Sequence, residues 1–424
     1  MMKLKLLMSA GALCLTMTAS AGGLMTNTNY HIAFDRMMAR GASMEIDAAY
    51  SNPAGLVWGY EGFQMSLDFQ KPWQRRDIEL GGTTYEGKAS APIVPALFAS
   101  YRKDRLAVSA MIGIVGSGGF VEYNDGVPMF NVPVRTMIAL SSMQAPYTLD
   151  SEMKGKQYIY GGQVNVAYRL TDWLSAAVGF RANYYDGYYK GHVVADMSGT
   201  KLVNLQLDCP QKGWGFAPIV SVDYHQGPLT VAARYEFRTK LETENDTKEL
   251  KAEIMGNTPE QTAKVFGSRM AGYMDGVKTR YDMPALLAVA VGYELTPRLR
   301  ATAEYHFFDD KNAKMADNRQ EHLTRGTHEV QLGAEYDIND RWTVSLGGQR
   351  TDYGLSDDYQ QDTSFACDSY SIGIGGAWNV TEKLRLNAGY FISLYSDYTK
   401  TSQLGQETFS RTNNVVGVGI DYKF

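Results

Sequence analysis

The chain has 424 residues, of which 44% are hydrophobic, 21% charged and 12% aromatic, and its formal net charge is −5. This mild charge, without a basic run, excludes a typical nucleic-acid-binding protein. After the N-terminal segment, no stretch is apolar over the roughly 20 residues that a transmembrane helix needs. The 28 tyrosines are an excess, and Tyr gathers where apolar structure meets water, as at membrane interfaces.

The N-terminus predicts export. Lys3 and Lys5 form a positively charged start, residues 6–17 are apolar, and residues 19–21 have the small-residue form of a cleavage site. These features are typical of a secretory signal peptide, here over residues 1–21. A retained membrane anchor is the alternative, but the apolar run is too short to span a bilayer.

Residues 22–60 differ in pattern from the rest of the mature chain. They are rich in Ala, Met and Asn, and apolar and polar residues do not alternate. Short helices are expected within residues 32–50. An ordered turn follows, because Pro53 disfavours the helical conformation at Asn52 and Gly55 relaxes the backbone.

From residue 61 onward, apolar and polar residues alternate with a period of two, which indicates strands with one apolar face. Very short turns alternate with long polar segments along the chain. Fourteen strands are predicted, near residues 62–74, 92–102, 105–115, 156–170, 173–189, 214–226, 229–240, 280–295, 298–309, 326–338, 341–352, 369–380, 383–396 and 412–424.

The last predicted strand carries two signals. One face is apolar without a break, at Val416, Val418, Ile420, Tyr422 and Phe424. Gly419, Tyr422 and Phe424 also resemble the C-terminal signal that the outer-membrane assembly machinery reads, although Gly417 stands where that signal has a polar residue. An even number of strands with short turns at one end is typical of barrels in the outer membrane of Gram-negative bacteria. Closure satisfies every backbone group in lipid, so this strand should seal against the one that begins near Gly62.

The strand count also predicts a plug. Barrels of about eight strands fill their interior with side chains, whereas those of 16–18 leave a channel. A fourteen-stranded barrel lies between these sizes and would leak unless its lumen were filled. We therefore predict an all-β fold, a fourteen-stranded antiparallel transmembrane β-barrel over residues 61–424. Residues 22–60 would form an N-terminal hatch of short helices inside it, the alternative being a floppy periplasmic tail.

Residues 39–56, ARGASMEIDAAYSNPAGL, resemble the N-terminal signature of the FadL family of outer-membrane transporters for hydrophobic compounds. The matching residues are Asp47 with Ala48, and Asn52, Pro53 and Ala54, with Gly55 following. In outline, the resemblance covers the whole chain. It implies passive transport of long-chain fatty acids or similar molecules, captured outside and released sideways into outer-membrane lipid when the hatch moves. We expect no cofactor, and a barrel that can stand alone as a monomer.

The segment 242–279 is the candidate for ligand capture. The residues that recur there at helical spacing include Val265, Phe266, Met270, Tyr273 and Met274. Met suits ligands of variable shape, and helical extracellular loops do this work in the resembled family. Packing of this face on neighbouring loops is the alternative. Long extracellular loops are also expected at 116–155, which is apolar enough to fold over or into the mouth, and at 190–213.

In the resembled family, an inward kink in the third strand opens the barrel wall. Here the predicted third strand, 105–115, runs into Gly116, Gly118 and Gly119. Glycines inside a strand indicate a bulge or kink. Ordinary loop glycines after the end of the strand are the alternative.

Charged residues are also predicted to face the lumen, at Arg234, Glu236, Arg238, Arg300, Glu304, Glu329, Glu335 and Arg385. Most should form a network that holds the hatch, while one Arg could meet a fatty-acid carboxylate. Cys209 and Cys367 both fall on the long-loop side. They could form a disulfide in an oxidising envelope, or remain two separate thiols.

Three other functions remain open from the sequence. A general or solute-specific porin would have an open lumen and no hatch. An outer-membrane lipase or protease would need a nucleophile beside a base, but no G-x-S-x-G motif is present and no catalytic residue is assigned. A soluble secreted β-protein is the third. No Cys and His cluster suggests a metal site.

Overall fold

The structure, a computed structural model, describes residues 23–140, 145–402 and 405–424. The predicted signal peptide lies outside these residues. No helix in the described part of the chain is long and apolar enough to cross a membrane.

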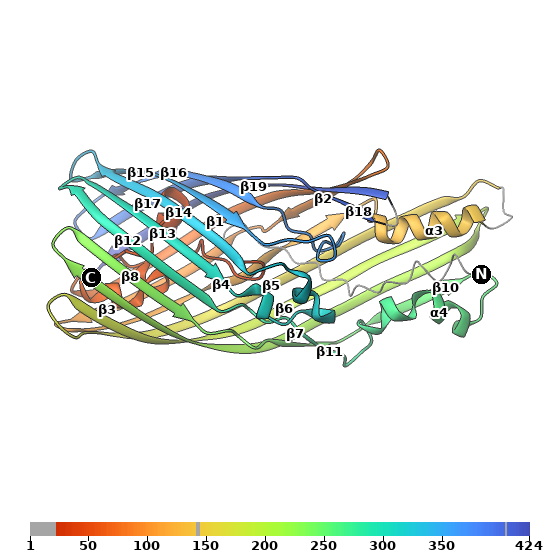
Figure 1. The fold of residues 1–424 in the computed structure, drawn as a ribbon, viewed down its shortest axis with the longest axis horizontal. Coiled ribbons are helices and arrows are strands. Elements are labelled where there is room, and N and C mark those ends of the chain that lie inside the picture. Colours follow the sequence, from red (N-terminus) through yellow and green to blue (C-terminus); the bar gives the residue numbers. More distant parts are fainter. Residues whose placement is uncertain (1–22, 141–144, 403–404) are drawn as a thin grey trace.

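Strands form a closed antiparallel barrel (Figure 1). The fourteen strands around the ring are β1 (Gly62–Leu80), β3 (Val94–Lys103), β4 (Leu106–Tyr123), β5 (Thr148–Arg169), β6 (Leu174–Met197), β7 (Thr200–Gln226), β8 (Leu229–Glu236), β12 (Leu286–Thr296), β13 (Leu299–Phe308), β14 (Thr327–Asp337), β15 (Trp342–Asp352), β16 (Ser369–Asn379), β17 (Leu384–Tyr395) and β19 (Gly405–Lys423). β1 and β19 close the ring, with Gln64 opposite Lys423 and Leu80 opposite Glu407. The predicted fold class is confirmed.

Shorter elements extend the barrel on the side away from the tight turns. The strands are β2 (Thr83–Ser90), β9 (Glu242–Asn245), β10 (Glu249–Ile254), β11 (Lys278–Arg280) and β18 (Tyr398–Ser402). The helices on that side are α3 (Pro128–Leu140), α4 (Pro259–Ala271), η3 (Asp310–Asn312) and η4 (Ala316–His322). Short turns mark the periplasmic end of such barrels, so this end is extracellular.

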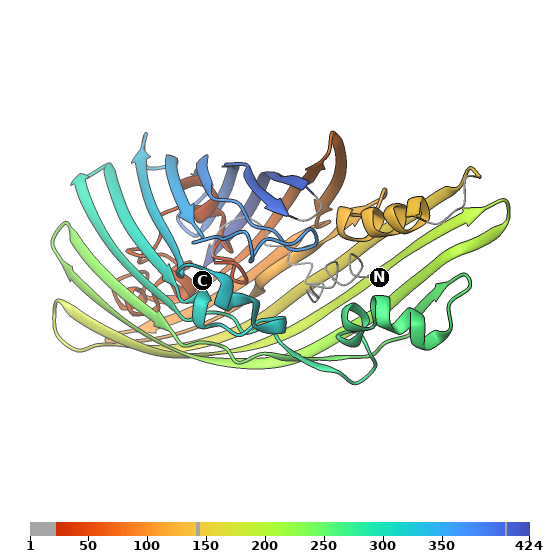
Figure 2. The ribbon, with the colours of Figure 1, turned by 45° about the vertical axis from the view of Figure 1, so that its right-hand side comes forward.

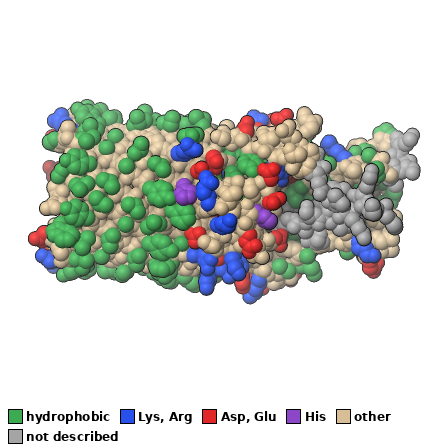
Figure 3. Space-filling model, viewed as in Figure 1, with side chains coloured by type: hydrophobic (Ala, Val, Ile, Leu, Met, Phe, Trp, Pro, Cys, Tyr) green, Lys and Arg blue, Asp and Glu red, His purple; other side chains and the backbone are tan. Residues whose placement is uncertain are grey.

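Apolar side chains on the outside of the barrel alternate with polar side chains in its lumen, as expected for a barrel in a membrane. On β14, Val330 and Leu332 point outward and are 51% and 60% exposed, whereas Glu329 and Gln331 are buried in the lumen. Apolar side chains cover the part of the barrel near the tight turns, and charged ones gather beyond it (Figure 3). Such an apolar band fits the hydrocarbon core of a bilayer.

Residues 190–213, predicted as a loop, instead form the continuous hairpin of β6 and β7. Alternation persists there, but with its polarity reversed: Val193 and Leu205 now point inward and are buried, while His192 and Gln206 point outward. Outside the bilayer the interior is the apolar side, which favours this inversion. β5, β6 and β7 therefore project beyond the other strands (Figure 2). Within 116–155, β4 and β5 are likewise extended, with α3 between them.

The hatch segment lies inside the barrel, in its periplasmic half (Figure 1). It contains α1 (Ile32–Met37), α2 (Ala48–Ser51) and η2 (Pro53–Val57). Every residue of α1 is buried. The short helices predicted for this segment are present.

Candidate ligand path through the barrel

Glycines on the inner wall let α1 approach the strands closely. A Cβ added at Gly333 or Gly347 would strike the carbonyl oxygen of Met37, and one at Gly373 would strike that of Asp35. Gly347 lies opposite Gly333 on one side and opposite Gly373 on the other. These three glycines therefore leave room for the helix to pack against β14, β15 and β16.

Buried charges fix the hatch to the same side of the wall. The guanidinium of Arg40 contacts Asp47 within the hatch, with Nε to Oδ2 at 2.7 Å, and Glu335 of β14, with Nη1 to Oε2 at 3.2 Å. Arg36 also pairs with Glu335, and both of these side chains are buried. Arg385 of β17 pairs with the more exposed Glu45. Removing one partner from a buried pair costs about 3–5 kcal/mol because the other charge is left uncompensated. This cluster should therefore resist displacement of the hatch.

The Asn-Pro-Ala segment contacts the opposite side of the wall. Asn52 donates to the carboxylate of Asp223 on β7 at 2.6 Å. The Ala54 amide donates to Ser221 Oγ at 3.1 Å, and its carbonyl accepts from Ser175 Oγ at 2.8 Å. Pro53 starts η2, where its missing N–H costs nothing. Asp47 and Asn52, which lie towards the two ends of the signature, therefore both take part in contacts that hold the hatch in place.

Most of the charges predicted to face the lumen do so. Glu236, Glu304, Glu329, Glu335 and Arg234 are buried, Arg300 and Arg385 are half-buried, and Arg238 is more exposed. Glu304 accepts from the amides of Arg40 and Gly41, both at 2.7 Å, and pairs with His306. The sequence predicted that these charged side chains point into the lumen, but it did not predict which hatch residues they contact.

The third barrel strand, β4, borders a break in the wall. β3 pairs with β4 as far as Leu97 opposite Ile112, and β2 resumes the pairing with Ser90 opposite Phe120. Residues 113–119 of β4 thus lack a strand partner on that side. Pro92 and Pro95 lie where β2 passes into β3, and proline has no N–H to donate.

The predicted glycines lie within this break. The pairing of β4 with β5 shifts register between Ile114 and Gly116 and again between Ser117 and Gly119, and Ser117 has a φ of +55°. Two bulges so close together bend a strand and leave backbone groups outside the ladder. Gly118 lies within the second of these shifts.

The first described residues of the hatch cover the break from inside. The Asn27 amide donates to the carbonyl of Val115 at 3.1 Å, and its side chain donates to that of Ile114 at 3.2 Å. The Tyr30 hydroxyl also donates to Val115, at 3.1 Å. These residues were not predicted as part of the site, because their partners are main-chain carbonyls of a distant strand.

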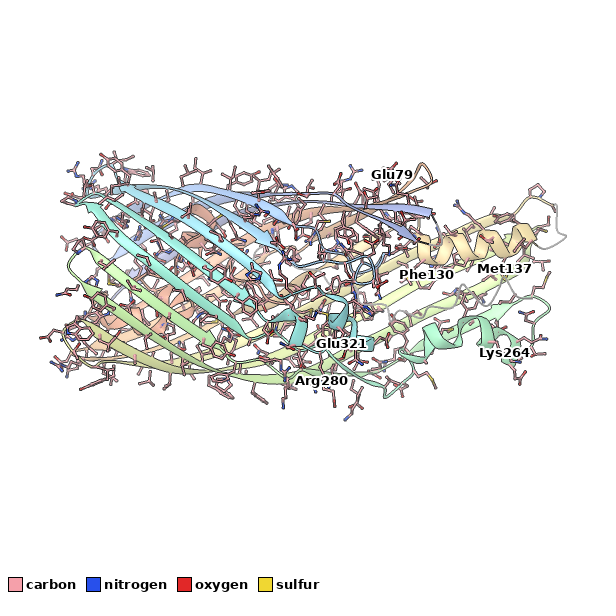
Figure 4. The ribbon with its side chains drawn as sticks, in the orientation of Figure 1. Glu79, Phe130, Met137, Lys264, Arg280 and Glu321 are labelled. Atoms are coloured by element: carbon pink, nitrogen blue, oxygen red, sulfur yellow. The ribbon has the colours of Figure 1, made fainter. Side chains whose placement is uncertain are left out.

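An apolar pocket lies at the extracellular end. It has an empty volume of about 490 Å³, part of it open to solvent, and is lined chiefly by Phe130, Met153, Val193, Leu205, Phe266, Met270 and Tyr273. Phe130 belongs to α3, which lies at the same end of the barrel as α4 (Figure 4). Thr258 and Gln261 form a capping box that fixes where α4 begins.

Three of the five predicted capture residues meet in this pocket, namely Phe266, Met270 and Tyr273. Met274 lies outside it and is 55% exposed. Val265 lies on α4, but its side chain is outside the described part of the structure. A second pocket, of about 360 Å³, lies deeper, between the hatch and the wall, and Tyr30 lines it.

The two cysteines are not bonded to each other. Both are free and buried, and both lie in the apolar cluster that contains Phe365 and Phe409. Cys209 accepts from Thr247 Oγ1 at 3.3 Å, and Cys367 lies 3.6 Å from the Phe409 carbonyl. The possible disulfide is therefore absent. No group of His, Cys, Asp or Glu suited to a metal ion occurs among the described residues.

Comparison with known proteins agrees with this geometry. Residues 261–424 match the family model of the outer membrane protein beta-barrel domain. No curated protein sequence matches the chain. Among solved structures, a Pseudomonas aeruginosa FadL homologue matches with a TM-score of 0.67 and 13% identity, over 95% of this chain and 100% of that one.

Two toluene transporters match similarly. The P. putida protein TodX gives a TM-score of 0.60 and 13% identity, over 96% of this chain and 99% of that one. The Ralstonia pickettii protein TbuX gives 0.57 and 15%, over 98% of each. With its apolar outer band, the chain is a Gram-negative outer-membrane β-barrel, and it shares its closed fold with these structures.

Proposed function

We propose that this chain is a FadL-family transporter that carries hydrophobic small molecules, such as long-chain fatty acids, across the outer membrane. The observation that carries the proposal is the break beside residues 113–119 of β4, covered from within by Asn27 and Tyr30. Uncovered carbonyls in lipid are costly. A break in the barrel wall that is covered from inside therefore suits a transporter whose ligand leaves sideways through that break.

The two pockets are proposed to bind the ligand before it reaches the break in the wall. The ligand is captured in the apolar pocket beneath α3 and α4, where water is displaced from Phe266 and Met270. It then reaches the deeper pocket beside Tyr30. Movement of residues 25–30 exposes the break in β4, and the ligand diffuses into the surrounding lipid without an energy source. The C-terminal strand, β19, remains the predicted signal for the outer-membrane assembly machinery. We propose that the barrel acts as a monomer.

The porin alternative is less well supported, because the hatch is tied to opposite sides of the wall by Asn52 and Arg40. A steady, large ohmic conductance in planar bilayers would favour a porin. The enzyme alternative has no support from the site, whose lining side chains are mostly apolar at the mouth. Absence of esterase and protease activity in the purified protein is expected.

A cysteine pair tests the release step. Asn27→Cys and Ser117→Cys, in a chain that also carries Cys209→Ser and Cys367→Ser, place thiols on the hatch and on the bulge. Oxidation, checked by a gel shift, should block fatty-acid uptake, and a reductant should restore it. Each single cysteine variant is the control. Uptake that continues in the oxidised pair would contradict lateral release, and a wild-type protein that neither co-purifies with nor binds an apolar ligand would contradict transport.

A further inference from the structure

Two arginines face each other on the inner wall near the extracellular end. Arg76 of β1 lies directly opposite Arg411 of β19 in the strand register. The two side chains are only 2% and 4% exposed. Like charges placed opposite each other across two strands repel, and burial in apolar surroundings strengthens the effect. This arrangement needs a compensating group.

The protein supplies only part of that compensation at Arg76. Its Nη2 donates to the carbonyl of Phe365 at 2.6 Å, and its guanidinium lies 4.6 Å from the centre of the Phe365 ring. The Tyr123 hydroxyl is a further, neutral partner of its side chain, but Arg76 forms no ion pair with a carboxylate among the described residues. Glu407, four residues before Arg411 on β19, is paired with Lys400 at 3.1 Å. Arg411 donates to Gln74 at 3.2 Å and lies over Tyr395.

The surroundings of the arginine pair are apolar and continuous with the capture pocket. Phe365, Phe409 and Tyr123 belong to one buried cluster that also contains Met153 and Tyr273. The last two line the capture pocket. An alkyl chain lying along this cluster would bring a polar head group to Arg76.

We propose that Arg76 and Arg411 form an anion site that binds the carboxylate of an acidic amphiphile within the barrel. A carboxylate is planar and accepts two parallel hydrogen bonds from a guanidinium, a geometry that a neutral hydrocarbon cannot offer. The inference rests on the proposed function and narrows its ligand class. The site would favour fatty acids over uncharged hydrocarbons of the same length.

Equilibrium binding of dodecanoate and dodecanol to the full-length protein, in a neutral detergent at pH 8, tests the site. The wild type should bind the acid about tenfold or more tightly than the alcohol, as expected for a charge-assisted hydrogen bond. Arg76→Gln should bring the affinity for the acid down to that for the alcohol and leave the alcohol unchanged. Arg76→Lys, which keeps the charge but not the planar fork, should lie between.

Arg75→Gln is the matched control. Arg75 is the preceding residue on β1, but it is exposed and pairs with Asp77 and Glu86. Its replacement should leave both affinities unchanged. Equal affinity of the wild type for the acid and the alcohol would overturn the anion site but not the transport proposal. The same conclusion would follow if Arg76→Gln lowered the affinity for both ligands to the same extent. Binding of neither ligand by the wild type would overturn both proposals.

Discussion

The side-chain amide of Asn52 donates a hydrogen bond of 2.6 Å to the carboxylate of Asp223, which joins the hatch to β7 of the barrel wall. Both side chains are almost fully buried, at 1% and 0% exposed. A buried acceptor that is left without its donor costs about 1–3 kcal/mol of stability. This bond therefore contributes to holding residues 52–57 against β7.

Asn52→Ala should loosen the hatch and raise the ion conductance of the barrel in planar bilayers. Asp223 would lose its amide donor, and the hatch would become easier to cleave by added protease. Ser51→Ala is the control, because among the described residues the Ser51 hydroxyl bonds only to the carbonyl of Asp47, within the hatch. Equal conductance in the Asn52 variant and the wild type would show that the buried charges around Glu335 hold the hatch without Asn52.

Gly116→Ala should disturb the seal over the break in β4. A Cβ at this position would strike the carbonyl oxygen of Met25 and lie 2.8 Å from Ile159 Cδ1, and such overpacking costs about 1–3 kcal/mol. Gly162→Ala on β5 is the control, since a Cβ there meets nothing within 4 Å. Single-channel recording should show transient openings in the Gly116 variant but not in the control. Quiet traces from both would mean that residues 25–30 do not seal the wall.

Phe266→Ala should weaken ligand capture. Phe266 is 5% exposed and lines the extracellular pocket. Loss of a buried phenyl contact is expected to reduce affinity by about 10- to 100-fold. Lys264→Ala, on an exposed position of the same helix, is the control. Fluorescent fatty-acid titration measures both, and unchanged affinity in the Phe266 variant would place capture elsewhere.

Asp362 should make the outer loops more stable at acidic pH. It is buried in the loop that connects β15 to β16, and it accepts from the Met129 amide at 2.6 Å. Burial, followed by the nearby charge of Glu407, raises the pKa of Asp362 to about 7. The folded protein therefore holds this proton when the unfolded chain has released it, so stability falls as the pH rises towards 7 and then levels off.

Asp362→Asn keeps an acceptor for Met129 but cannot ionise. Its melting temperature should match that of the wild type near pH 5 and exceed it at pH 8, when measured by the heat-induced shift in gel migration. Hydrogen exchange of the Met129 amide provides a local measurement. A difference between the two proteins that does not vary with pH would show that Asp362 stays ionised throughout this range.

The two thiols should stay reduced and react slowly. Burial raises the pKa of Cys367 to about 11, so only about one thiol in a thousand is ionised at pH 8. Alkylation by a maleimide should require unfolding, and migration on gels should not depend on a reductant. A faster band without reductant that is lost in Cys209→Ser would show that a disulfide forms.

The sequence by itself determined the barrel. Alternation with a period of two places each side chain on the lipid or lumen face locally, so fourteen strands could be located from neighbouring residues alone, and their even number predicted a closed ring. The turn at Asn52 was also readable locally, because Pro53 restricts the backbone of the residue before it, and the resemblance of this segment to the FadL signature indicated a hatch. The hairpin at 190–213 was missed, because the same alternation changes its meaning once β6 leaves the bilayer and its apolar face turns inward.

The path of the ligand was decided only by the tertiary structure. The break beside Gly116 exists because β2 and β3 stop pairing on either side of it, and Asn27 covers it across some ninety residues of sequence. Arg76 and Arg411 became a pair only through the register of the first and last strands. Strand register and long-range hydrogen bonds depend on how the whole ring closes, and no local pattern contains that information.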